Sequence, residues 1–370
     1  MPRDFQLFLA AMFVFGFSQS IVDSTFNNFL NETFSIGNLQ RGLLELPREL
    51  PGLLTIVISA ILFFICSRRQ AALSNLLCAF GILFIGLFSP TFSVMVIWLF
   101  IFSTGQHLFI PLNQSIGMEL AVKGETGKRL GQFSAVSNIA MIIGSFAVLI
   151  GFKFFHLNFK ISYVVAFLGF LTVAVLIFLM KKDEPVPIKM KFQLRREYKL
   201  YYWLTILYGT RKQLFLTFAP WVLVTVFKQK TEILATLLTI GGIIGIFFKP
   251  MLGKAIDKMG ERLILTAEAA LLVLVCISYG FARDIFTETT ALYMVFISYI
   301  CDQLLLSAGM ARATYLQKIA LRPEDVSQTL TMATSIDHIF SISIALFGGF
   351  IWVKWGYQYL FLLGAIIAVI

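Results

Sequence analysis

Several charged or titratable side chains lie inside long apolar stretches of this chain. They are Asp23, His107, Arg211, Lys212, Asp302, Asp337 and His338. A charge in apolar surroundings costs about 3 kcal/mol or more, so each one needs a partner or a function. A buried carboxylic acid can exchange a proton near neutral pH, which makes Asp23 and Asp302 candidates for proton coupling. A guanidinium or ammonium group can hold an anionic group, which is the role expected of Arg211 and also of Lys212.

The spacing of uncharged polar residues places several of them on shared helix faces. Gln19, Asp23 and Asn27 recur every fourth residue, so they lie along one face of a helix. Seven residues separate Gln106 from Asn113, which puts these two on nearly the same side of another helix. The side chains expected to offer hydrogen bonds to a solute are Gln106, Asn113, Gln213 and Gln303.

The two adjacent cations allow two interpretations. Arg211 and Lys212 diverge by about 100° on a helix, so they cannot both contact one ligand. In the first interpretation, Arg211 holds an anionic or amphiphilic solute. In the second, Asp302 and Asp337 pair with Arg211 and Lys212, and the charges of the C-terminal half are balanced without any ligand. The sequence leaves both open.

The remaining ionisable residues of the apolar stretches are given structural roles. A hydrogen bond between helices is the simpler role for the two histidines. Glu45, Arg48 and Glu49 are interpreted as a solvated cluster at the outer end of the second stretch. Glu119 and Glu268 lie near cytoplasmic helix ends, so no transport role is assigned to them.

The composition indicates an all-α integral membrane protein. Hydrophobic residues make up 58% of the 370 positions and charged residues 14%, with a mean hydropathy of +0.84. Lipid requires each backbone N–H and C=O to be paired internally, which runs of about twenty apolar residues achieve as helices. The net charge of +10 is attributed to helix ends rather than to nucleic-acid binding. The four cysteines form no C-x-x-C pair, so we expect no metal site and no cofactor.

About twelve transmembrane helices are predicted. The apolar stretches cover 6–30, 43–66, 72–89, 92–118, 131–152, 161–180, 200–227, 232–252, 263–282, 289–311, 327–350 and 358–370. The last is too short to cross a bilayer, so the final helix is expected to be truncated in this sequence. A weak repeat after the fourth and tenth stretches favours two six-helix halves. The predicted domains are 1–180 and 200–370, joined by a basic linker at 181–199.

The distribution of Lys and Arg predicts that the N-terminus lies in the cytoplasm, in a multi-pass protein of the cell (cytoplasmic) membrane. One set of inter-helix segments holds most of the basic residues. It contains Arg68, Arg69, Lys123, Lys128, Arg129, the 181–199 linker, Lys254, Lys258, Arg262, Arg312, Lys318 and Arg322.

A motif follows the eighth stretch. Gly253, Asp257, Lys258, Gly260 and Arg262 give the pattern G-x-x-x-D-[KR]-x-G-x-[KR], and here the sequence resembles the major facilitator superfamily (MFS). We expect Gly253 and Gly260 to permit a tight reversal, and Asp257 to cap the next helix or to pair with a cation. The resemblance implies that this loop helps to lock one state of an alternating-access cycle. The simpler interpretation is a basic cytoplasmic turn.

The resemblance also implies that helices 1, 4, 7 and 10 line a central cavity, and most of the buried charges fall on these helices. Three features depart from the family pattern. The loop at 66–70 keeps a basic pair but lacks the Gly and Asp of the motif. The family's Arg-containing pattern in helix 4 and its Gly-Pro pattern in helix 5 are also missing, which disfavours proton-coupled drug efflux.

We therefore predict a secondary active transporter, not an enzyme, that moves a small solute by alternating access with proton coupling. The expected partners are the lipid bilayer, a small-molecule solute and protons, with no nucleic acid, and the protein is expected to be a monomer. The alternatives are a membrane-embedded enzyme, although the sequence contains no H-E-x-x-H or paired Asp-rich segment, and a transporter-like receptor without flux. A channel is disfavoured because no filter-like segment is visible.

Overall fold

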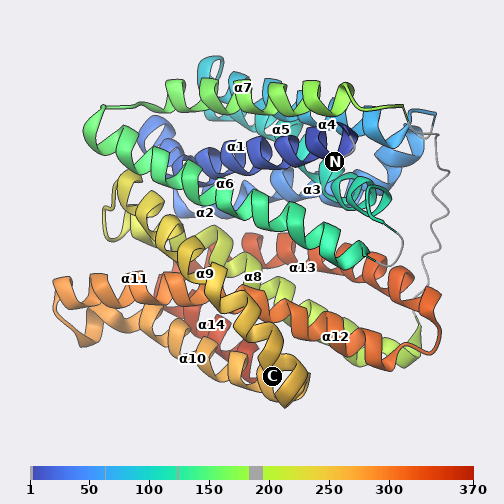
Figure 1. The fold of residues 1–370 in the computed structure, drawn as a ribbon. Helices are drawn as coiled ribbons and strands as arrows, with labels where there is room; N and C mark the ends of the chain where they lie inside the picture. The colour runs from blue at the N-terminus through green and yellow to red at the C-terminus, as the bar shows by residue number, and fades with distance from the viewer. Residues whose placement is uncertain (1–2, 63, 123–124, 183–194) are drawn as a thin grey trace. The chain divides into compact units, whose positions relative to one another are not determined.

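The computed structural model describes residues 3–62, 64–122, 125–182 and 195–370, which form helices and no strand (Figure 1). The chain divides into two compact units. Unit 1 comprises Met1–Ser35, Pro47–Lys189 and Lys230–Gly242, and unit 2 comprises Ile36–Leu46, Met190–Gln229 and Ile243–Ile370. Residues 183–194 of the predicted linker lie outside the described part of the chain. The predicted domain limits stay a prediction.

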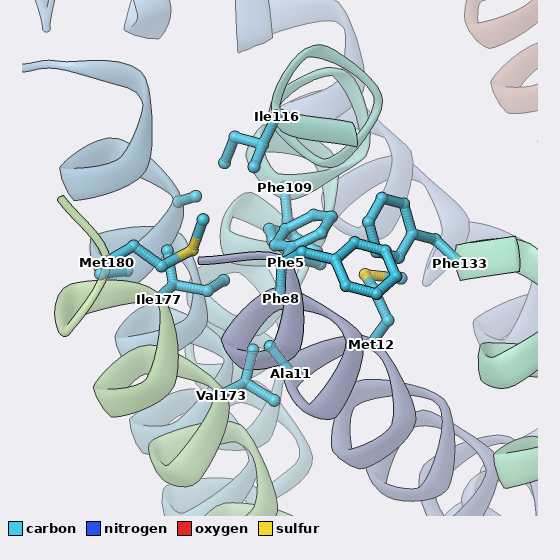
Figure 2. Close-up of a cluster of buried hydrophobic side chains, with 12 residues drawn as sticks. Phe5, Phe8, Ala11, Met12, Phe109, Ile116, Phe133, Val173, Ile177 and Met180 are labelled. Carbon is cyan, nitrogen blue, oxygen red and sulfur yellow. The ribbon is translucent and has the colours of Figure 1, made fainter. Parts of the chain in front are cut away.

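Unit 1 is a bundle in which α1 packs against α6 and α7, and α4 packs against α5 and α7. Its helices are α1 (Arg3–Phe34), most of α3 (Glu45–Ile61), α4 (Ser67–Leu87), α5 (Phe92–Glu119), α6 (Thr126–Phe154), α7 (Phe159–Phe178) and the start of α9 (Thr231–Met259). Aromatic side chains from α1, α5 and α6 meet in its core (Figure 2). The rings of Phe8 and Phe133 are perpendicular, with centroids 4.8 Å apart, a favourable geometry for aromatic pairs.

Unit 2 is a second bundle, in which α8 packs against α13, and α10 packs against α11 and α14. Its helices are α2 (Asn38–Leu43), α8 (Lys199–Thr225), the rest of α9, α10 (Glu261–Ile285), α11 (Glu288–Leu305), α12 (Gly309–Ile319), α13 (Pro323–Trp355) and α14 (Tyr357–Val369). Phe215, Tyr279 and Phe361 form its aromatic core, with Tyr279 stacked on Phe361 at 4.8 Å.

Two predicted stretches are interrupted in the structure. The stretch predicted at 43–66 corresponds to α3, which is separated from α2 by Leu44. The stretch at 289–311 is divided by a 3₁₀ turn at Leu306–Ala308, so that α12 starts at Gly309 and ends at Ile319. A 3₁₀ turn has about 3.0 residues per turn instead of about 3.6, so the side chains of α11 and α12 do not follow one helical period.

Nine helices of the described chain are long and apolar enough to cross a membrane, and α14 is a shorter apolar helix. The stretches predicted at 43–66 and 200–227 are not among the nine. The first is a helix of only 17 residues, and α8 carries Arg211, Lys212 and Gln213 near its middle, which lower its hydropathy. With α3, α8 and α14 included, the helices fit the predicted twelve-helix all-α membrane fold.

The turn after α9 differs from the expectation at two positions. Gly253 lies within α9, which continues to Met259, so it makes no reversal. Gly260 alone makes the turn, with φ of +84°, in the left-handed region that favours glycine. Gly260 is also the residue that precedes α10, so Asp257, exposed in the last turn of α9, does not cap that helix.

The segment before α8 is attached to the start of α13. The Tyr198 hydroxyl donates to Asp325 Oδ2 at 2.8 Å and accepts from the Leu321 N–H at 3.0 Å. Arg195 reaches the same carboxylate oxygen at 2.9 Å. Burial raises the pKa of Tyr198, so its phenol remains a neutral donor at physiological pH.

Candidate functional site

In unit 1, two amides and one carboxylate form a chain of hydrogen bonds, called here the amide chain. Gln106 Nε2 on α5 donates to Gln19 Oε1 on α1 at 2.6 Å. Gln19 Nε2 in turn donates to Asp23 Oδ1 at 2.9 Å, within the same helix face. Gln19 accepts through its carbonyl and donates through its NH₂ group, so the chain runs from a donor on α5 to an acid on α1. All three side chains are partly exposed.

The start of α3 supplies the charges that face this chain. The charge of Arg48 acts on Asp23, and the Arg48 backbone carbonyl accepts a hydrogen bond from the Ser103 hydroxyl of α5. His107 Nδ1 is 3.0 Å from that hydroxyl, and His107 Nε2 is 3.7 Å from Glu49 Oε2. The predicted solvated cluster is therefore wrong for this part, because Arg48 and Glu49 face α1 and α5 within the bundle.

Two other predicted polar residues of unit 1 do not join the amide chain. Asn27 lies one turn beyond Asp23 on α1 and is buried. Asn113 lies two turns beyond Gln106 on α5 and is partly exposed. The structure therefore brings together Asp23 and Gln106 of the predicted set, with Gln19 between them.

In unit 2, Arg211 lies between two acids. Its Nη2 is 2.9 Å from Asp302 Oδ1 of α11, and its Nη1 is 3.7 Å from Glu268 Oε1 of α10. The Arg211 and Asp302 side chains are only 3% and 6% exposed, so the pair is shielded from solvent and its attraction is strong. The contact between Arg211 and Asp302 is nevertheless an ion pair whose angles do not meet those of a hydrogen bond. Within the described chain, Arg211 Nε, Nη1 and Nη2 have no hydrogen-bond acceptor.

Lys212 points away from Arg211 and pairs with Asp337 of α13, as the 100° divergence predicts. Gly209 makes room for this acid. A Cβ atom at position 209 would overlap Asp337 Oδ1, so the carboxylate would have to move. The Ser341 hydroxyl, one turn along α13, reaches the Gly209 carbonyl at 3.4 Å. Close packing of α13 on α8 thus sets the position of Asp337.

A third cation completes the group. The Arg312 guanidinium of α12 stacks on the Tyr208 ring of α8, with its carbon 3.3 Å from the ring centroid, and its charge acts on Glu268. We call these six ionisable residues the ion cluster: Arg211, Lys212, Glu268, Asp302, Arg312 and Asp337. Three are cations and three are acids, so the fully ionised cluster carries no net charge.

A cavity of about 780 Å³ in unit 2 reaches the ion cluster. Its polar lining consists of the charged residues Arg211, Glu261, Arg262, Glu268 and Arg312 and the hydroxyl-bearing residues Tyr208, Thr266 and Tyr315. Apolar side chains of α8, α10 and the end of α14 form the rest. The cavity therefore combines charged groups with apolar walls. Such a lining suits a solute with both polar and apolar faces.

Gln213 links α8 to Glu45, the first residue of α3, rather than joining the ion cluster. Its Nε2 donates to Glu45 Oε2 at 2.9 Å and to Thr217 Oγ1 at 3.0 Å. Glu45 also binds Arg41 at 2.5 Å, and both side chains are fully buried. The interpretation of Glu45 as solvated is therefore wrong, because a short broken helix carries it into the interior of unit 2.

The other predicted residues of unit 2 lie outside the ion cluster. Gln303 follows Asp302 on α11, so its side chain diverges from that acid and is partly exposed. Lys258 and Arg262 are exposed at either side of the turn at Gly260. Sequence reasoning missed Glu268 and Arg312. Glu268 was assigned no transport role because it lies near a helix end. The position of Arg312 depends on the 3₁₀ turn before α12, which the sequence pattern did not predict.

Comparisons with known proteins agree with this architecture. The sequence profile described as Major Facilitator Superfamily matches residues 8–322. The solved structure of the nucleoside transporter NupG has a TM-score of 0.74 at 14% identity, covering 100% of this chain and 97% of that one. A D-xylose-proton symporter has 0.73 at 13%, covering 99% and 95%. The peptide transporter POT, solved as a mutant in complex with sulfate, has 0.74 at 12%, covering 100% and 93%. No curated protein sequence matches.

Proposed function

Because the chain belongs to the major facilitator superfamily, we propose that it is a secondary active transporter that couples the movement of a small solute to protons. The observation that carries the proposal is the position of Arg211 between Asp302 and Glu268. One guanidinium with two acids can lose one negative charge to a proton and still keep an ion pair. Such a group can bind and release a proton without leaving an isolated buried charge.

The structural neighbours support transport and do not specify the solute. They are described as transporters of nucleosides, xylose and peptides, and one is described as a proton symporter. At 12–14% identity they show the fold alone. Asp302, Glu268 and Arg211 are assigned to proton coupling, and Asp23 with Gln19 and Gln106 to hydrogen bonding of the solute.

The solute need not be anionic. That expectation required cations without partners, whereas Arg211 and Lys212 each hold an acid. The proposal also includes the orientation of the chain and a role for the turn after α9. The N-terminus is cytoplasmic in a cell membrane, and the Gly253–Arg262 segment contributes to a conformational lock through the turn at Gly260.

The test starts from binding, because a cavity ligand stabilises the state that it binds. Purified protein is screened by thermal shift against nucleosides, sugars, dipeptides and their charged derivatives. Solutes that stabilise it are then offered to proteoliposomes with and without an imposed pH gradient. The proposal predicts accumulation that depends on the gradient. Binding without movement under either condition would contradict it and would favour a receptor without flux.

A further inference from the structure

The charges of the ion cluster restrict the chemistry of the solute. Arg211 is held by Asp302 and Glu268, Lys212 by Asp337, and Arg312 acts on Glu268. Three cations therefore face three acids. In unit 1, the described charge that acts on Asp23 is that of Arg48.

A solute with a net charge would disturb this balance. An anion brought next to Arg211 would compete with acids that are already in place, and it would leave one buried negative charge without a partner. Removing the partner of a buried ion is strongly unfavourable, whereas a neutral molecule leaves every pair intact. In the fully ionised cluster, this balance therefore favours a solute without net charge.

Polar groups on the wall of the cavity can form hydrogen bonds with such a solute. Arg211 is a donor and Glu268 an acceptor, and both line the cavity together with Thr266 and Tyr315. A hydroxyl group both accepts and donates, so it can serve such a donor and such an acceptor at once.

We infer that the transported solute is a net-neutral molecule bound through hydroxyl or amide groups. This inference rests on the proposed function and adds to it the chemical class of the solute. It also assigns Asp337 a role in specificity. By neutralising Lys212 beside Gly209, Asp337 prevents the ion cluster from acting as an anion site.

The experiment compares neutral and anionic members of matched pairs by thermal shift: D-xylose with D-xylonate, uridine with uridine monophosphate, and N-acetyl-dialanine amide with N-acetyl-dialanine. Acetate is added as a simple anion. For the native protein, we expect the neutral member of any stabilising pair to bind at least about tenfold more tightly than its anion. A native protein that binds an anion more tightly than its neutral partner would overturn the inference.

Variants make the test independent of the natural solute. Asp337→Ala leaves Lys212 without its partner, so acetate should stabilise this variant. Acetate should not stabilise the native protein or the double variant Lys212→Met/Asp337→Ala. The exposed Glu125→Gln variant changes the net charge equally at a surface pair with Lys128 and should behave as the native protein. Failure of acetate to stabilise Asp337→Ala selectively would overturn the role of Asp337.

Failure of this inference and failure of the proposed function give different results. A proton moving with a neutral solute carries one positive charge, so uptake generates a current across the proteoliposome membrane. A proton moving with a monoanion generates none. Gradient-driven uptake without current would overturn the neutral solute and keep transport, whereas binding without uptake would overturn transport.

Discussion

The two units stabilise the polar groups among their apolar helices by different interactions. Unit 1 relies on neutral amides that lead to one acid, from Gln106 through Gln19 to Asp23. Unit 2 relies on ion pairs drawn from four helices, α8, α10, α11 and α13. Amide hydrogen bonds contribute modestly and tolerate change, whereas one partner of a buried ion pair cannot be removed without a large penalty. We propose that the amide chain of unit 1 contributes hydrogen bonds to the solute, whereas the ion cluster of unit 2 binds the coupling proton.

The ends of the bundles do not share this difference. In unit 1, Arg68 at the start of α4 binds Glu119 at the end of α5 at 2.7 Å, and it also binds Asp4. In unit 2, Glu261 at the start of α10 binds Lys318 near the end of α12 at 2.5 Å, with the two charges exchanged. An ion pair at a bundle end can have its acid and its base on either helix, which is consistent with a structural role. The ion pairs of the interior differ between the units, so they say more about function than those at the ends.

The largest expected effect is the loss of a cation from the ion cluster. Arg211→Met leaves Asp302 buried beside Glu268 without a cation, and we expect the free energy of unfolding to fall by about 3–5 kcal/mol. The double variant Arg211→Met/Asp302→Asn should recover part of this loss, because it removes the isolated charge. Thermal unfolding of both variants in detergent measures the difference. Equal stability of the two would contradict the assignment of a compensated ion pair.

Two glycines offer a matched comparison between the units. A Cβ at Gly16 of unit 1 would overlap the Ser137 backbone oxygen, so α1 and α6 must separate. A Cβ at Gly209 would meet the Asp337 carboxylate, which can move as a side chain. We expect Gly16→Ala to lower stability by about 1–3 kcal/mol. Gly209→Ala should lower it less, but it should alter the response to anions because Asp337 is displaced from Lys212.

Acetate titration followed by thermal shift, applied to both glycine variants, distinguishes these effects. Only Gly209→Ala should gain a response to the anion. The same response in Gly16→Ala would show that general loosening of a bundle, rather than the position of Asp337, admits anions.

The smallest expected effect is in the amide chain. Gln106→Leu removes the first donor of the chain and leaves the Gln19–Asp23 hydrogen bond in place. Loss of one such hydrogen bond should weaken solute binding by about 1 kcal/mol, or roughly fivefold, with little change in stability. Competition binding measures this effect. A loss as large as that of Arg211→Met would remove the distinction between the two units.

Sequence reasoning left ion pairing as one of two interpretations and did not assign individual pairs. Two cations and two acids on apolar helices suggested that Asp302 and Asp337 pair with Arg211 and Lys212, and the divergence of adjacent side chains excluded a shared ligand. It did not recover Glu45, because the break at Leu44 between α2 and α3 lets it pair with Arg41 inside the bundle. It did not recover Glu268 or Arg312 either, since their proximity to Arg211 depends on helix packing and on the 3₁₀ turn before α12.

The most direct test of proton coupling uses Asp302→Asn in proteoliposomes, with a solute identified by the thermal-shift screen. Exchange of labelled for unlabelled solute needs no net proton movement, whereas uptake driven by a pH gradient does. We expect Asp302→Asn to retain exchange within about twofold and to lose net gradient-driven uptake by at least about tenfold. The Glu125→Gln variant should retain both activities. Undiminished gradient-driven uptake by Asp302→Asn would contradict the account.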